Sequence, residues 1–139
     1  MISKETSAAE TNFAGKRVLI VEDNKINLMV AQAILESLGC SIEIAENGRN
    51  GIECMAAGGF DIVLMDCQMP EMDGFEATRV WRAREGEGAK RLTIVAVTAN
   101  ALKGDRERCL AVGMDDYLSK PFTRAQLVST LARWVSPAL

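Results

Sequence analysis

Short apolar segments alternate with helical patterns five times along this chain, and this alternation limits the possible folds more than any other feature. We expect strands at about 17–21, 41–45, 61–65, 92–97 and 115–118. Strict alternation of strand and helix implies right-handed crossovers, which give a parallel sheet with helices on both faces. The sequence therefore predicts an α/β fold with a five-stranded parallel sheet, flavodoxin-like and doubly wound.

The strands differ in their patterns, and this difference indicates which of them are central. Strands 17–21, 61–65 and 92–97 are continuously apolar, as strands buried on both faces are, whereas 41–45 alternates as an edge strand does. We expect the order 2-1-3-4-5, which would place Glu22, Asp23 and Asp66 side by side. In such sheets ligands bind at the carboxyl ends of the strands, at the topological switch point.

Helical periodicity fills the intervals between the strands. We expect Asp23 or Asn24 to cap the first helix, and further helices at about 74–84, 101–112 and 123–135. Asn47-Gly48 is compatible with a hairpin turn, but the residues behind it have helical spacing, which favours a helix start. Two apolar stripes are expected to face the core: Ile26, Val30, Ala33, Ile34 and Leu38 in the first helix, and Leu127, Val128, Leu131, Trp134 and Val135 in the last.

Bulk properties indicate one globular domain. The 139 residues are 48% hydrophobic with a net charge of −3, so there is no basic face for nucleic acid. No apolar stretch approaches the roughly 20 residues that span a bilayer, and no signal peptide is recognisable, so we expect a cytoplasmic location without membrane contact. We assign residues 1–15 to a flexible linker, 16–136 to the folded domain and 137–139 to a tail.

Cysteine and histidine usage excludes several kinds of site. The four cysteines lack CxxC spacing and the chain has no histidine, which argues against a zinc site and excludes histidine-based catalysis. We interpret Cys40, Cys54, Cys67 and Cys109 as small core residues in a reducing compartment. The absence of histidine also excludes a role for this segment as a phosphohistidine donor.

Polar side chains gather where the predicted strands end. Glu22 and Asp23 follow the first strand, Asp66 the third, Thr98 the fourth and Lys120 the fifth. Each alone has an ordinary explanation, because acids favour the first turn of a helix and threonine favours strands. Together at one sheet edge, three acids, a hydroxyl and an ammonium suit magnesium-assisted phosphoryl transfer.

Three carboxylates in one cleft repel each other unless a cation is present. Magnesium takes about six oxygen ligands and retains waters, so we expect Asp23 and Asp66 as direct ligands, Glu22 mainly through water, and the main-chain carbonyl of Gln68. Asp66 can then attack a phosphorus atom, and the metal and Lys120 spread the developing charge. The Lys120–Pro121 bond can adopt the cis form, although most X-Pro bonds are trans.

These motifs resemble the receiver domain of two-component response regulators over about residues 16–136. The matching segments are 18–24, 65–74, 97–101 and 113–122. The resemblance implies that Asp66 is the phosphoacceptor, that Glu22 and Asp23 form the magnesium-binding acid pair, and that Thr98 and Lys120 are the switch hydroxyl and lysine. The amino-acid sequence around Asp66 and Thr98 is most similar to that of receivers of hybrid sensor histidine kinases.

The resemblance also implies a partner and a switch. A histidine kinase or histidine phosphotransfer domain is the expected phosphoryl donor. Tyr117 matches the switch aromatic, and phosphorylation is expected to change the face built from the helix at 101–112, the strand at 115–118 and the helix at 123–135. Gln68 and Asn100 match positions that tune self-dephosphorylation, although they can equally be loop residues, with Asn100 capping a helix.

Two other classes of protein share an aspartyl nucleophile at a strand end or the same fold. A haloacid-dehalogenase-like phosphotransferase or phosphatase needs a second aspartate two residues after the nucleophile, where this chain has Gln68. A flavodoxin-like FMN-binding module needs a hydroxyl- and glycine-rich phosphate loop after the first strand, where this chain has Glu22-Asp23-Asn24. We expect a phosphoacceptor that is not a conventional enzyme by itself.

Overall fold

The computed structural model describes residues 12–86, 90–99 and 103–136, and it confirms the predicted parallel sheet with the order β2-β1-β3-β4-β5. The strands are β1 (Arg17–Val21), β2 (Ser41–Ala45), β3 (Ile62–Asp66), β4 (Ile94–Thr98) and β5 (Asp116–Ser119). The helices are α2 (Lys25–Ser37), α3 (Gly48–Ala57), α4 (Gly74–Arg84), α5 (Lys103–Ala111) and α6 (Arg124–Trp134). The last three strands end one residue later than predicted.

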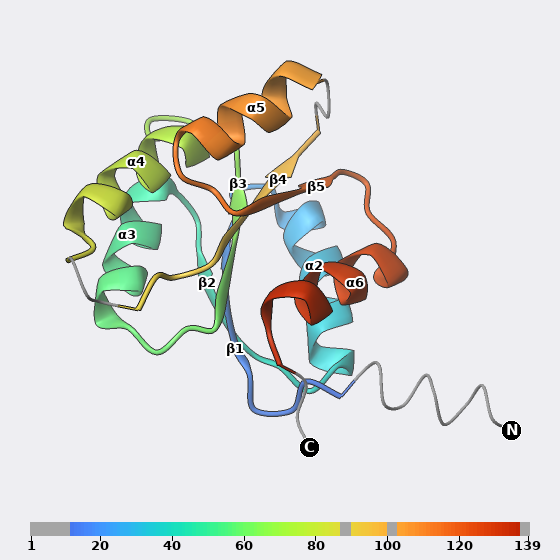
Figure 1. Ribbon diagram of the computed structural model, residues 1–139. Helices are drawn as coiled ribbons and strands as arrows, with labels where there is room; N and C mark the ends of the chain where they lie inside the picture. The colour runs from blue at the N-terminus through green and yellow to red at the C-terminus, as the bar shows by residue number, and fades with distance from the viewer. Residues whose placement is uncertain (1–11, 87–89, 100–102, 137–139) are drawn as a thin grey trace, which may run out of the picture.

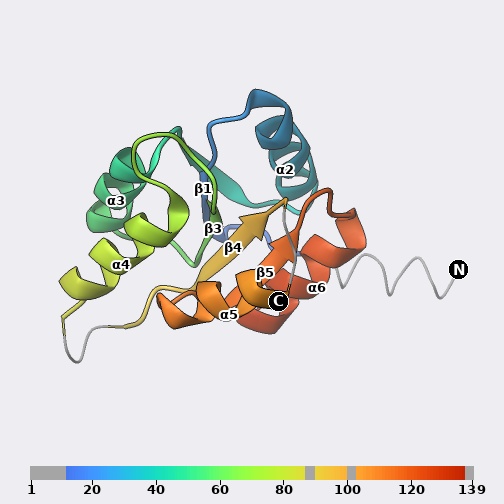
Figure 2. The same ribbon diagram turned by 90° about the horizontal axis from the view of Figure 1, so that it is seen from above.

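The sheet is covered on both faces (Figures 1 and 2). Helices α3, α4 and α5 lie on one face, and α2 and α6 lie on the other. Successive β3 residues alternate between the two resulting cores: Val63, Met65 and the following Cys67 pack with the first group of helices, whereas Ile62 and Leu64 pack with the second. This alternation follows from the pleat of a strand buried on both faces.

Side-chain caps define where the helices begin. Asn24 caps α2 by accepting hydrogen bonds from two backbone N–H groups, and Asp73 caps α4 in the same way through one. Asn47 caps α3, so the Asn47-Gly48 dipeptide starts a helix as predicted. Thr123 and Gln126 form a capping box at the start of α6.

The apolar stripe predicted for the first helix is only partly confirmed. Leu38 is buried and Ile34 packs against the same core, as predicted. Ile26 and Val30 are instead 72% and 47% exposed, and Ala31 and Leu35 are buried in their place. Helix α2 carries apolar residues around most of its circumference, so its sequence fits more than one buried face. In α6 the stripe is confirmed for Leu127, Leu131 and Val135, whereas Trp134 is 39% exposed and donates its Nε1–H to Asp116 at 2.8 Å.

The buried core includes one residue from the segment expected to be a linker. Phe13 is completely buried in the core beneath α2 and α6, and its backbone N–H donates to the carbonyl of Leu38 at 2.9 Å. Burying a phenylalanine side chain contributes about 2–3 kcal/mol. A single aromatic residue within a polar segment lacks periodicity, so sequence patterns left it in the predicted linker.

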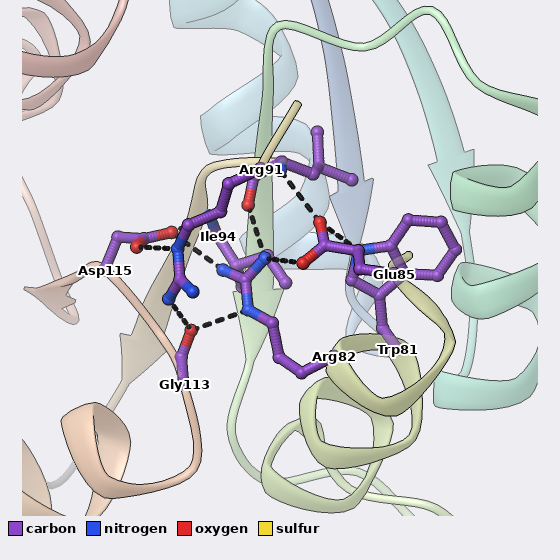
Figure 3. A network of polar contacts seen from close by, with 8 residues as sticks. Trp81, Arg82, Glu85, Arg91, Ile94, Gly113 and Asp115 are labelled. Atoms are coloured by element: carbon purple, nitrogen blue, oxygen red, sulfur yellow. Dashed lines mark hydrogen bonds and ion pairs between the residues drawn. The ribbon is translucent and has the colours of Figure 1, made fainter. Parts of the chain in front are cut away.

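A guanidinium network ties the amino-terminal ends of β4 and β5 to α4 (Figure 3). Arg82 donates to the carboxylates of Glu85 at 2.8 Å and Asp115 at 2.9 Å, and to the carbonyls of Leu92 at 2.8 Å and Gly113 at 2.9 Å. Its side chain is only 13% exposed, so these contacts are largely shielded from water. This network lies at the opposite end of the strands from the polar residues that follow them.

None of the helices in the described ranges combines the length and apolar character that crossing a bilayer requires.

Candidate functional site

The carboxyl edge of the sheet brings the predicted acids together. Strands β1 and β3 are neighbours with Val21 opposite Met65, so Glu22 and Asp66 follow at the same level. One carboxylate oxygen from each of Glu22, Asp23 and Asp66 lies within 4.8 Å of the others. Glu22 and Asp66 are buried at 4% exposure, whereas Asp23 is exposed.

Lys120 joins this cluster from the carboxyl end of β5, which lies beyond β4 in the sheet. Its Nζ lies 3.0 Å from Glu22 Oε1 and 3.4 Å from Asp66 Oδ1. The backbone N–H of Lys120 donates to the carbonyl of Thr98 at 2.8 Å, which extends the ladder between β4 and β5 by one residue. The Lys120–Pro121 peptide bond is cis. The structure therefore brings the predicted lysine into direct contact with two of the three acids.

The ionisation of Asp66 reflects a crowded and buried environment. Burial and the neighbouring carboxyl of Glu22 raise the pKa of Asp66 to about 7, while the Gln68 N–H and the Lys120 ammonium lower it. Burial is the largest of these effects, because it disfavours the charged form of the Asp66 carboxyl. Asp66 therefore changes its charge near neutral pH in the absence of a further cation.

The loop that follows β3 holds Asp66 in place. The backbone N–H of Gln68 donates to Asp66 Oδ1 at 3.1 Å, and the N–H of Gly74 donates to the Cys67 carbonyl at 3.2 Å. Gly74 begins α4 directly against this turn, and a Cβ there would come within 2.2 Å of the Asp66 carbonyl oxygen. Only glycine permits that approach, so this position fixes how closely α4 packs on the site.

Thr98 lies at the end of β4, as predicted, and contacts a residue that the sequence did not single out. Its hydroxyl donates to Asp105 Oδ2 in α5 at 3.4 Å. Asp105 is half-buried. No local pattern marks a carboxylate seven residues away as a partner, because the contact depends on where α5 lies on the sheet.

The remaining predicted site residues are less constrained. The side chain of Gln68 is exposed. Tyr117 lies in β5, where it is half-buried and the guanidinium of Arg106 lies 5.7 Å from its ring centroid. Asn100 lies outside the described residues.

An apolar surface borders the acidic cluster, and sequence periodicity missed it. Ile26, Met29 and Val30 of α2 are 72%, 67% and 47% exposed. Val30 also lines a small cavity whose wall includes Asp66, Lys120 and Phe122. Three large apolar side chains at this spacing form a continuous stripe on one helix face. We call Ile26, Met29 and Val30 the α2 apolar stripe.

Comparison with known proteins agrees with this geometry. The response regulator receiver domain family matches residues 18–132. Hybrid signal transduction histidine kinase B of Dictyostelium discoideum is 39% identical over 134 residues, which cover 90% of this chain. The chain spans only 7% of the length of that relative.

Solved structures give the same assignment. The receiver domain of sensor histidine kinase PA1611 from Pseudomonas aeruginosa, with a magnesium ion coordinated in its active site cleft, is 47% identical with a TM-score of 0.78, covering 87% of this chain and 98% of its own. The receiver domain of Ssk1 from Saccharomyces cerevisiae, co-crystallised with the histidine phosphotransfer protein Ypd1, is 32% identical with a TM-score of 0.81, covering 88% and 90%.

The raised pKa of Asp66 predicts that Asp66→Asn stabilises the protein at neutral pH without magnesium. The pKa of Asp66 is about 7 in the folded state and about 3.9 in the unfolded chain. Between these two pH values the folded protein holds a proton on Asp66 that the unfolded chain has lost. The wild type therefore loses stability as the pH rises from about 3.9 to about 7. Asparagine does not ionise, so the variant avoids this loss.

The stability difference should be about 2 kcal/mol near pH 8, after allowance for screening by water, and should vanish near pH 4. Urea unfolding with EDTA across this range measures it. Glu71→Gln, an exposed acid in the same loop, is the control and should leave the pH dependence unchanged. A difference between Asp66→Asn and wild type that stays constant with pH would contradict the assignment.

Proposed function

The chain belongs to the response regulator receiver domain family, and on that premise we propose that Asp66 accepts a phosphoryl group from a phosphohistidine with the aid of magnesium. The observation that carries the proposal is the buried Asp66 carboxylate in contact with Lys120 and within 4.8 Å of two further acids. We place the receiver unit from Phe13 to residue 136, with residues before and after it as linker and tail.

The donor set fits a divalent cation. Three carboxylates and one ammonium leave two negative charges, which one divalent cation balances, and oxygen-only ligands are those that magnesium prefers. We assign Asp23 and Asp66 as direct ligands, Glu22 through water because Lys120 and the Asn24 N–H already occupy its oxygens, and the carbonyl of Gln68. Bound magnesium would offset the negative charge of the phosphoryl oxygens.

The chain's own residues supply the rest of the reaction. An oxygen of ionised Asp66 attacks the phosphorus atom while the phosphorus–nitrogen bond of the donor breaks, and the imidazole leaves with the bonding electrons. Lys120, already 3.4 Å from Asp66, donates hydrogen bonds to the transferred phosphoryl oxygens. Because the chain has no histidine, the donor is a histidine kinase or a histidine phosphotransfer domain on another domain or protein.

Phosphorylation acts on the face built from α5, β5 and α6 through Thr98. The phosphoryl group adds a charge of about −2, which competes with Asp105 for the Thr98 hydroxyl. As Thr98 turns toward the phosphoryl group, its contact with α5 is lost, and Tyr117 rotates into the space that Thr98 leaves. Gln68 and Asn100 tune hydrolysis by orienting water, since amides hydrogen-bond water but are too weakly basic to deprotonate it.

Asp66→Asn should abolish phosphorylation by acetyl phosphate and magnesium, because the amide is not a nucleophile. Intact-protein mass spectrometry should show one added phosphoryl group on the wild type and on Glu71→Gln, and none on Asp66→Asn. Amide chemical shifts of the phosphorylated wild type should change at Tyr117 as well as in the loop after β3. Labelling of Asp66→Asn at the wild-type rate would exclude Asp66 as the acceptor, and shifts confined to the loop would exclude the switch.

Asp23→Ala should weaken magnesium binding more than Glu22→Ala does, by roughly tenfold against a few-fold, because only Asp23 offers a carboxylate that no lysine engages. Calorimetric titration of the unphosphorylated protein with magnesium chloride measures both. Glu36→Gln, an exposed acid near the end of α2, should bind as the wild type does. Equal affinities in all four proteins would remove the acid pair from the metal site.

The phosphohistidine partner is proposed to dock on the α2 apolar stripe. Any donor must bring its imidazole to Asp66, and the stripe borders the cavity that Asp66 lines. Exposed apolar side chains at helical spacing are typical of surfaces that bind another protein.

Met29→Lys should reduce the rate of phosphotransfer at least about tenfold when the donor is a histidine phosphotransfer protein that labels the wild type, since a charge replaces an apolar contact. The rate with acetyl phosphate should not change, because a small donor needs no docking surface. Glu36→Gln on the same helix serves as the control. Equal loss with both donors would show that the substitution damages the site rather than the docking surface.

A further inference from the structure

Two buried cysteines meet directly behind the phosphoacceptor loop. Cys67 Sγ and Cys109 Sγ lie 3.8 Å apart, although 42 positions separate them in the sequence. Cys67 immediately follows β3, whereas Cys109 lies near the end of α5, and their exposures are 1% and 0%. Cys40 and Cys54 are free and half-buried. The pair therefore connects the residue next to Asp66 with the helix that contacts Thr98.

One of the two cysteines borders a surface pocket. Cys67 lines a hollow between the loop after β3 and α5, together with Gln68, Phe75, Asp105 and Arg108. Cys109 is fully buried, and Cys67 itself is only 1% exposed. A small solute in this pocket therefore reaches the pair from the side of Cys67, and only when the wall of the pocket opens.

We propose that Cys67 and Cys109 form a reversible disulfide when a hydroperoxide oxidises the protein. One sulfur of the pair attacks the peroxide oxygen, whose O–O bond breaks, giving a sulfenic acid and releasing water or an alcohol. The other sulfur then displaces the hydroxyl group of that sulfenic acid as water, and a thiol reductant restores both thiols. The sulfurs must approach from 3.8 Å to about 2.05 Å.

The disulfide would restrain the switch, a consequence that rests on the proposed function. Cys109 and Asp105 are four residues apart in α5, so they lie on the same face of the helix. A covalent bond from Cys67 to Cys109 holds that face against the sheet, where Asp105 accepts the Thr98 hydroxyl. The oxidised protein should therefore transmit phosphorylation of Asp66 more weakly to Tyr117 and α6.

Peptide mapping of the complete 139-residue chain tests the bond itself. After treatment with hydrogen peroxide at neutral pH and alkylation of the remaining thiols, a protease that cuts before aspartate separates Cys67 in peptide 66–72 from Cys109 in peptide 105–114. Cys40 and Cys54 fall together in peptide 23–60. We expect peptides 66–72 and 105–114 to be linked, lighter than their sum by two hydrogen atoms, and to separate on reduction.

Two variants and one condition serve as controls. Cys54→Ser should still form the linked peptide, whereas Cys109→Ser should not. Oxidation of the chain unfolded in guanidinium should give mixed pairings instead of the single native one. Cys67 converted to sulfinic acid without a linked peptide, or equal yields from folded and unfolded chain, would overturn the proposal. The wild-type comparison decides this even if Cys109→Ser does not fold.

A second readout separates this proposal from the proposed function. Reduced and oxidised wild type are each phosphorylated with acetyl phosphate, and amide shifts are followed at Tyr117. We expect both forms to take up phosphate and the Tyr117 shift to be smaller in the oxidised form by at least about twofold. Failure of both forms to take up phosphate would refute the proposed function and leave the disulfide standing. Equal shifts in the two forms would overturn the restraint on the switch.

Discussion

The contact of one buried ammonium with two buried carboxylates is the interaction on which the site depends. Lys120 lies 3.0 Å from Glu22 and 3.4 Å from Asp66, and all three side chains are at most 15% exposed. A buried charge that is not fully compensated is costly, which is why the pKa of Asp66 rises to about 7. The protein thus holds an acceptor whose charge depends on what else binds beside it. A divalent cation suits such a site because it is opposite in charge to the carboxylates. The cation would in turn offset the negative charge of a phosphoryl group.

The parallel sheet is what makes this contact possible. Glu22 and Asp66 come from adjacent strands, and Lys120 comes from an edge strand beyond β4. No local segment could bring these three charges so close together. Two contacts then restrain the acceptor. Gly74 packs closely against the Asp66 carbonyl, and the Gln68 N–H donates a hydrogen bond to the Asp66 side chain. The site is therefore a property of strand order and of one tight turn.

Local patterns predicted the strands and the polar residues at their ends because these depend on periods within single segments. They failed where tertiary packing decides between alternatives. Helix α2 could bury several faces, and the sheet selected Ala31 and Leu35 instead of Ile26 and Val30. The Thr98–Asp105 contact and the Cys67–Cys109 contact join α5 to strand ends, so no spacing in the sequence indicates them. Phe13 was missed because a single aromatic residue in a polar segment shows no helical or strand periodicity.

The alternation of side chains at the end of β3 separates two tasks in space. Asp66 lines the cavity bordered by α2, on the side where the α2 apolar stripe is exposed. Cys67, one residue later, packs on the opposite side of the sheet against Cys109 of α5. Thr98 ends β4 in contact with that same helix. In the proposed mechanism the donor docks on α2 and the response to phosphorylation passes through α5, so the two steps use opposite sides of the sheet. The proposed disulfide at Cys67 would then alter the response without blocking the donor.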